Sequence, residues 1–159
     1  MEPIRLELES RLAVEPAQAW RWATSLKGIS AELSPLLRMS APRGVQGIGD
    51  MLVTPGRPLF RSRIYLFGFL PIDRSDLTLM RLDEGQGFIE QSPMMSMSLW
   101  RHERRIARTA GGCTVTDSLV FEPRWARRLV AWFIGRVFAH RHAVMRKEMG
   151  ATRPWRSLG

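Results

Sequence analysis

The order of segments in this chain of 159 residues predicts an α+β fold in which an antiparallel sheet packs against a C-terminal helix. Three observations lead to this class. An alternating strand opens the chain, a series of strands without helices between them fills its middle, and an amphipathic helix closes it. Because 45% of the residues are apolar, we expect one domain with a substantial core over residues 1–150, followed by a tail over 151–159.

The first element is predicted from residues 4–14, in which apolar and polar side chains alternate. One face of this segment carries Ile4, Leu6, Leu8, Leu12 and Val14. The other face carries Arg5, Glu7, Glu9 and Arg11. A period of two with one apolar face is typical of a half-buried antiparallel strand.

One or two short helices are expected after this strand. The first covers residues 17–26 and follows Pro16, which suits the first turn of a helix. Gly28 is expected to end it. A second short helix over residues 30–37 would be interrupted by Pro35.

The middle of the chain reads as a strand meander. Residues 41–58 hold much of the glycine and proline, so we expect a mobile loop there, at the rim of a pocket. The predicted strands are 59–69, 76–83, 87–95, 97–108 and 113–121, with turns at 71–74, 83–85, 92–93 and 111–112. This spacing favours antiparallel pairing of successive strands. After Pro123 the period becomes helical over residues 125–149, and Gly150 ends that helix.

Composition limits the class of protein. A single cysteine, Cys113, excludes an intramolecular disulfide bond and a cysteine metal site. The first residues lack the basic segment and apolar run of a secretory signal. The longest apolar stretch, residues 129–138, is too short to cross a bilayer and is interrupted by Arg136. We therefore expect a cytoplasmic protein without a membrane span, a metal or a cofactor.

The formal net charge of +9 could attract nucleic acid or anionic lipid. The arginines are scattered from Arg5 to Arg156, with denser groups at residues 101–108 and 124–128. Such a distribution favours a solvated basic surface over a polyanion site, so nucleic acid is not an expected partner.

The last two strands are expected to place polar side chains on the inner face of the sheet. If Arg101, Glu103 and Arg105 lie in water, alternation turns inward Trp100, His102, Arg104 and Ile106. If the Gly111-Gly112 turn keeps the register, their partners on this face are Val115, Asp117, Leu119 and Phe121. Arg104 and Asp117 would then pair beside His102, whereas a shift of one residue would move Asp117 to the other face.

The terminal helix carries a broad apolar arc. Its centre consists of Val130, Phe133, Val137 and Val144, and the remaining side holds Arg128, Arg136, Arg146 and Lys147. Arg141 falls inside the apolar arc, where a charge is unexpected. Either it reaches a buried carboxylate such as Asp117 or Glu90, or it lies in water beyond the sheet. The second interpretation is favoured.

These features resemble the START-like superfamily, also called SRPBCC. The resemblance rests on the element order and on the segments 68–71, 100–104, 116–123 and 138–142. It implies a helix-grip fold, in which a curved antiparallel sheet of about six to seven strands wraps around the long C-terminal helix and leaves a cavity for an apolar or aromatic molecule. The superfamily contains polyketide cyclase/dehydrase-like enzymes as well as steroid and lipid carriers, so the resemblance implies no reaction.

The expected site lies between the sheet and the terminal helix. Its predicted lining is Trp100, His102, Arg104, Leu119, Phe121, Glu90, Met95, Phe133, Val137 and Arg141. Met94 and Met97, with Met80 on a neighbouring strand, could add adaptable surface.

We expect binding of a small hydrophobic molecule, such as a lipid, a polyketide or an isoprenoid-like compound, by a carrier or sensor. One alternative is a cyclase or dehydratase in which His102 exchanges protons with help from Asp117 or Glu90, and Arg104 or Arg141 stabilises negative charge. A buried structural role for these groups is favoured over catalysis. Another alternative is a protein that binds membrane surfaces through the basic helix 124–147, although the fold would already use that helix's apolar face.

Overall fold

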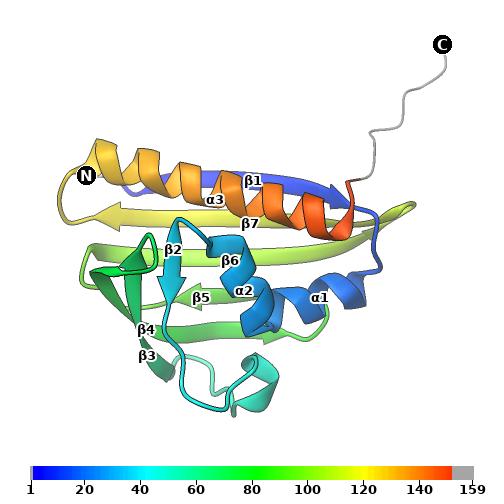
Figure 1. Ribbon diagram of the computed structural model, residues 1–159, viewed down its shortest axis with the longest axis horizontal. Coiled ribbons are helices and arrows are strands. Elements are labelled where there is room, and N and C mark those ends of the chain that lie inside the picture. Colours follow the sequence, from blue (N-terminus) through cyan, green and yellow to red (C-terminus); the bar gives the residue numbers. More distant parts are fainter. Residues whose placement is uncertain (1, 152–159) are drawn as a thin grey trace.

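The computed structural model describes residues 2–151 as one sheet and three helices, with one short 3-10 turn (Figure 1). The elements in chain order are β1 (Ile4–Leu12), α1 (Pro16–Thr24), α2 (Leu26–Leu33), β2 (Leu37–Met39), η1 (Ile48–Asp50), β3 (Pro58–Leu66), β4 (Leu70–Asp83), β5 (Gly87–Gln91), β6 (Met97–Thr109), β7 (Gly112–Pro123) and α3 (Arg127–Met149). The predicted tail lies outside the described residues from position 152 onward.

The seven strands form a curled antiparallel sheet in the order β1-β7-β6-β5-β4-β3-β2. Helix α3 runs along β1 and β7, and α1 and α2 lie beside it on the same face of the sheet (Figure 1). Apart from β1, which pairs with β7, each strand pairs with its neighbours in sequence, as expected of a meander. The predicted helix-grip class is confirmed.

The β6–β7 register, on which the expected polar group depends, is confirmed. Arg104 pairs with Asp117, and His102 pairs with Leu119. The turn between β6 and β7 contains Gly112, which has a φ of 152° and lies against β1. A Cβ atom at this position would be only 2.0 Å from the carbonyl oxygen of Leu12. Glycine at this position therefore lets the hairpin close against β1.

The helices differ from the prediction because the break occurs at Ser25. The Ser25 hydroxyl caps α2 by accepting a hydrogen bond from the Gly28 backbone N–H at 3.0 Å. Gly28 lies inside α2 and does not end α1. A Cβ atom on Gly28 would be 2.1 Å from the Trp22 carbonyl oxygen, so this glycine permits the close approach of the two helices. The predicted helix over 30–37 begins earlier than expected and ends at Leu33.

The turn predicted at residues 71–74 is wrong. The chain reverses at Phe67 and Gly68, whose φ angles are 53° and 83°, and β4 starts at Leu70. Residues 71–74 pair with β3 across a bulge, which accommodates Pro71 in the strand. Two other strands are shorter than expected: β1 ends at Leu12 and β5 ends at Gln91.

Two clusters of buried side chains form the core. One joins Leu12 and Val115 to Met145, and the other joins Leu119 and Phe121 to Phe138. Both place α3 against β1 and β7, which anchors the helix at two points along its length. Within residues 2–151, no helix is long and apolar enough to span a membrane.

Candidate functional site

A cavity of about 310 Å³ lies between the inner face of the sheet, α2, the 41–51 loop and α3. Most of its wall is apolar, with Leu79 from β4, Trp100 from β6 and Phe133 from α3 as examples. The loop that was expected at a pocket rim contributes Ala41, Val45 and Met51. The wall is therefore suited to a hydrophobic molecule.

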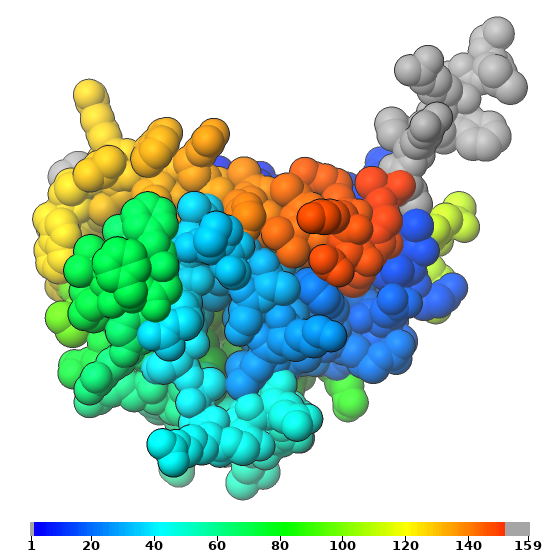
Figure 2. Space-filling view, in the orientation of Figure 1, coloured from blue at the N-terminus to red at the C-terminus, as the bar shows by residue number. Residues whose placement is uncertain are grey.

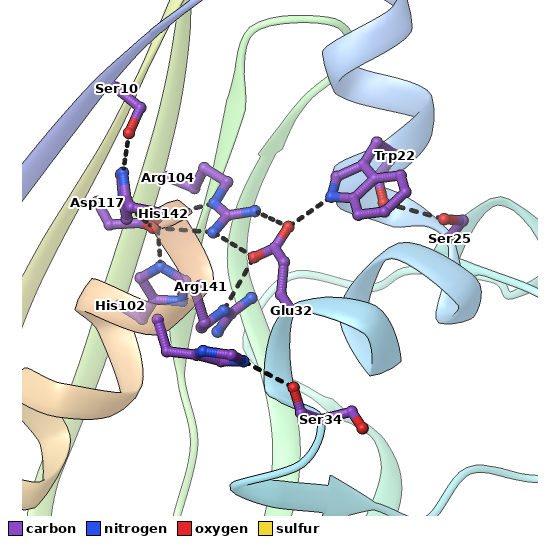
Figure 3. A network of polar contacts seen from close by, with 11 residues as sticks. Ser10, Trp22, Ser25, Glu32, Ser34, His102, Arg104, Asp117, Arg141 and His142 are labelled. Carbon is purple, nitrogen blue, oxygen red and sulfur yellow. Dashed lines mark hydrogen bonds and ion pairs between the residues drawn. The ribbon is translucent and has the colours of Figure 1, made fainter. Parts of the chain in front are cut away.

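A network of buried polar side chains adjoins this cavity (Figure 3). At its centre, the Asp117 carboxylate accepts hydrogen bonds from Arg104 Nε and Nη2, both at 2.8 Å. It also accepts from His102 Nε2 at 2.7 Å and His142 Nε2 at 2.8 Å. Four donors from β6 and α3 thus converge on one carboxylate of β7, which satisfies a charge that would otherwise be costly to bury.

Glu32 on α2 is the second carboxylate of the network. It accepts hydrogen bonds from Arg104 Nη2 at 2.9 Å, Arg141 Nε at 2.9 Å and the Trp22 indole at 2.7 Å. Arg104 therefore bridges Asp117 and Glu32, and it ties α2 to the sheet (Figure 3). Arg141 ties the same carboxylate to α3.

The charges of the network stabilise one another. Burial alone would raise the pKa of Glu32, but the Arg104 and Arg141 guanidinium groups outweigh it and lower this pKa to about 2. For Asp117, too, burial would raise the pKa, yet Arg104 and His102 hold it well below the usual value. Burial opposes the charge on Arg104, but Asp117 and Glu32 together raise its pKa. Two carboxylates and two guanidinium groups are thus charged at neutral pH and balance one another.

Hydrogen bonds occupy both ring nitrogens of His142. Its Nε2 donates to Asp117, because a carboxylate can only accept. The Ser10 hydroxyl, which accepts from Arg146 at 2.8 Å, lies 2.7 Å from His142 Nδ1. Both ring nitrogens of His142 are therefore occupied, and the histidine links β1, β7 and α3.

Residues 10–149 match the model of a family described as a domain of unknown function, DUF8410. The chain belongs to the DUF8410 family. No curated protein is a sequence match for it.

Several solved structures share the fold of this DUF8410 protein. The Zhui aromatase/cyclase from Streptomyces sp. R1128 superposes with a TM-score of 0.68 at 11% identity, over 92% of this chain and 93% of the other. Ara h 8.0201 gives 0.62 at 11% identity, over 92% and 97%. A START superfamily protein from Mycobacterium smegmatis gives 0.61 at 8% identity, over 94% and 97%. The predicted START-like resemblance is thus confirmed for the fold.

The DUF8410 chain places the predicted residues in three environments. In the cavity wall are Glu90, Trp100, His102, Phe133, Val137 and Arg141. Buried next to the wall, among the described residues, are Arg104, Leu119 and Phe121. Met95 is 54% exposed and is not part of the cavity wall in the described structure; it lies beyond the end of β5 at Gln91, where the predicted strand no longer continues. Met94 and Met97 line the cavity, whereas Met80 is exposed.

Arg141 does not lie in water, so the interpretation favoured from the sequence is wrong. Its side chain is mostly buried and binds a buried carboxylate, but that carboxylate is Glu32 and not Asp117 or Glu90. Glu90 instead accepts hydrogen bonds from the Trp100 indole at 3.2 Å and the Ser92 hydroxyl at 3.1 Å.

Sequence reasoning missed several members of the network, and the two that bind most directly to its charged groups are Glu32 and His142. Glu32 sits between Ile29 and Leu33 on the buried side of α2, and such a lone carboxylate on an apolar helical face was an available signal. His142 lies four residues after Phe138, on the same face of α3. This spacing could have placed it against the sheet.

Proposed function

We propose that this protein binds a small hydrophobic molecule in the cavity between the sheet and α3, as a carrier or sensor. The observation that carries the proposal is the cavity itself, with an apolar wall and few polar groups. Its volume of about 310 Å³ is at the lower end of ordinary ligand pockets. The ligand would therefore be small, on the scale of a few fused rings or a short lipid.

Two features support binding ahead of catalysis. Asp117 and Arg104 are enclosed and bonded to each other, so neither is available to a bound molecule. Trp100, Phe133 and Phe138 offer aromatic surface to a ligand. One fold neighbour is an aromatase/cyclase, which is consistent with an aromatic or polyketide-like ligand.

Filling the cavity is expected to abolish binding of an apolar probe. N-phenyl-1-naphthylamine, a neutral dye that fluoresces in apolar surroundings, should bind the wild-type protein at one saturable site. Replacing Ile134, which lines the cavity, by tryptophan should weaken that binding at least about tenfold, or roughly 1.4 kcal/mol. Fluorescence titration measures the effect.

Leu129→Trp is the matched control, because Leu129 lies on the exposed side of the same helix. It should leave the affinity for the dye within about twofold of wild type. Equal loss in both variants, or no saturable binding to the wild type, would contradict the cavity proposal. Native and denatured masses of the purified protein, followed by extraction, would identify any co-purifying molecule.

A second candidate function, binding to a membrane surface, is favoured by exposed apolar side chains at two neighbouring places. At the β3–β4 turn these are Phe67, Phe69 and Leu70, and at the start of α3 they are Trp125, Leu129 and Trp132. We call these six residues the apolar rim. Figure 2 shows the green surface of the β3–β4 turn beside the yellow surface where α3 begins. Phe69 is 73% and Trp132 is 62% exposed, which is unusual for such large apolar groups.

Charge and position favour a lipid bilayer as the partner of the apolar rim. Arg124, Arg128 and Arg136 are exposed close to it in sequence, which suits anionic headgroups. Trp125 belongs to both the apolar rim and the cavity wall, so a bilayer here would adjoin the cavity. The sheet does not bury all the apolar side chains of α3. Val137 and Phe138 are buried, whereas Leu129 and Trp132 are exposed.

Removing two residues of the apolar rim is expected to weaken vesicle binding. The double variant Phe69→Ser/Trp132→Ser should bind vesicles of phosphatidylcholine with phosphatidylserine about tenfold more weakly than wild type. Leu52→Ser is the control, since Leu52 is 92% exposed in the 41–58 loop. Co-sedimentation measures the effect. The membrane proposal would be contradicted if the wild-type protein did not bind vesicles at low salt, or if the control lost as much binding as the double variant. If the wild-type protein were a dimer and the double variant were not, the apolar rim would instead bind a second copy of the chain.

A further inference from the structure

We propose that His102 and Arg141 form a two-point anchor in the cavity that selects apolar molecules carrying a hydroxyl group. This inference rests on the proposed function, because it requires a ligand in the cavity. It goes further by naming the chemistry of the ligand's polar end: a phenol or alcohol on an apolar ring system or chain. The anchor is defined by His102 Nδ1 as acceptor and the Arg141 guanidinium as donor.

His102 presents a fixed hydrogen-bond acceptor. Its Nε2 must carry the proton, because it donates to the Asp117 carboxylate at 2.7 Å. The ring is held edge-on by Phe88, with centroids 5.6 Å apart, and by Phe138 at 5.1 Å. Nδ1 has no hydrogen-bond partner among the described residues, and His102 is part of the cavity wall. In the tautomer with its single proton on Nε2, Nδ1 is a lone-pair acceptor, and the proposed anchor uses this tautomer.

Arg141 supplies hydrogen-bond donors beside the same Phe138 ring. Its Nε donates to Glu32 at 2.9 Å, and its guanidinium carbon lies 4.9 Å from the centre of the Phe138 ring. The two terminal nitrogens have no partner within residues 2–151, and Arg141 lines the cavity. Because Glu32 balances the Arg141 charge, the spare N–H groups act as hydrogen-bond donors more than as an unpaired cation.

A hydroxyl group matches this pair, because it can donate its proton to His102 Nδ1 while its oxygen accepts from Arg141. A hydrocarbon would displace water and leave both groups unsatisfied, which is how hydrogen-bonding sites reject analogues without the group. A carboxylate has no proton to donate to His102 Nδ1. Its oxygen lone pairs would face the Nδ1 lone pair, and the two acceptors would repel each other. Discrimination of about 10- to 100-fold in favour of the hydroxyl is expected.

The test compares three ligands with the same ring system: 2-naphthol, 2-methylnaphthalene and 2-naphthoate. Displacement of N-phenyl-1-naphthylamine gives each affinity. The wild-type protein should bind 2-naphthol at least about tenfold more tightly than 2-methylnaphthalene, in which a methyl group replaces the hydroxyl. His102→Phe and Arg141→Met should each reduce this preference to within about twofold.

Matched controls separate the anchor from the network that supports it. His142→Phe removes another histidine from Asp117, and Arg146→Met removes another arginine from α3, but neither residue lines the cavity in the described structure. Both variants should keep the preference for 2-naphthol. If His102→Phe does not fold, nitrogen-15 NMR of the wild type still tests the inference, since 2-naphthol should shift the His102 Nδ1 resonance and 2-methylnaphthalene should not.

The outcomes distinguish the anchor from the proposed function. Equal affinity for 2-naphthol and 2-methylnaphthalene would overturn the anchor and leave hydrophobic binding intact. Tighter binding of 2-naphthoate would overturn the hydroxyl assignment in favour of an anionic ligand. No displacement by any of the three, together with no binding of the dye, would overturn the proposed function itself.

Discussion

Replacing Arg104 by methionine is expected to lower the free energy of unfolding by about 3–5 kcal/mol. The variant leaves Asp117 with its two histidine partners and Glu32 with Arg141 and Trp22, but it removes the cation that both carboxylates share. Both carboxylates are completely buried, so water cannot replace the lost guanidinium. Urea denaturation followed by circular dichroism measures the change.

Arg105→Met is the control for the Arg104 variant. Arg105 is the next residue of β6, but its side chain faces outward, is 53% exposed and pairs with the partly exposed Glu103. Exposed pairs of this kind contribute little, so a loss below about 0.5 kcal/mol is expected. Similar losses in the two variants would show that the buried bridge does not stabilise the fold.

Acid is expected to remove about 3 kcal/mol of stability through Glu32 alone. The pKa of Glu32 falls from 4.5 to about 2 on folding, because Arg104 and Arg141 outweigh the effect of burial. A carboxyl with a lowered pKa stabilises the fold fully above its unfolded pKa, and that contribution is lost as the pH falls from about 5 to about 2. Asp117, whose pKa is also lowered, adds to the loss in the same direction.

Glu32→Gln should flatten this part of the pH dependence, because glutamine does not titrate. The variant will be less stable at pH 7, so the informative quantity is the slope of unfolding free energy between pH 5 and pH 2.5. Glu7→Gln, on the exposed face of β1, is the control and should keep the wild-type slope. Identical slopes in both variants would exclude Glu32 as the source of the acid sensitivity.

The inner face of the β6–β7 hairpin could be predicted from the sequence because it depends on a strict period of two and one tight turn. If Arg104 faces inward, His102 faces inward as well, because the two residues are two positions apart in the same strand. The short turn then places Asp117 on β7 directly opposite Arg104. The apolar arc of α3 could be predicted for the same reason, since its period of 3.6 places Val137 toward the sheet.

The role of Glu32 is harder to predict, because the limits of its helix depend on two local signals that resemble others. Gly28 has the appearance of a helix end but allows the close approach of α1 and α2, and the actual break is the cap at Ser25. Glu32, the partner of Arg141, is 109 residues away in sequence and lies on α2, whose predicted limits were wrong.

The β3–β4 turn is another place where a local signal is ambiguous. Pro71 indicates a reversal of the chain, whereas Gly68 provides the positive φ at which the chain reverses.

The balance of charge in the buried network constrains how this family can vary. Two guanidinium groups and two carboxylates, from α2, β6, β7 and α3, neutralise one another away from water. Loss of the charge at any one of the four positions leaves a net charge in the interior, and a compensating loss of the opposite charge at a second position restores neutrality. We therefore expect these four positions to vary together among relatives, so that a relative without Glu32 would also lack the positive charge of Arg104 or Arg141.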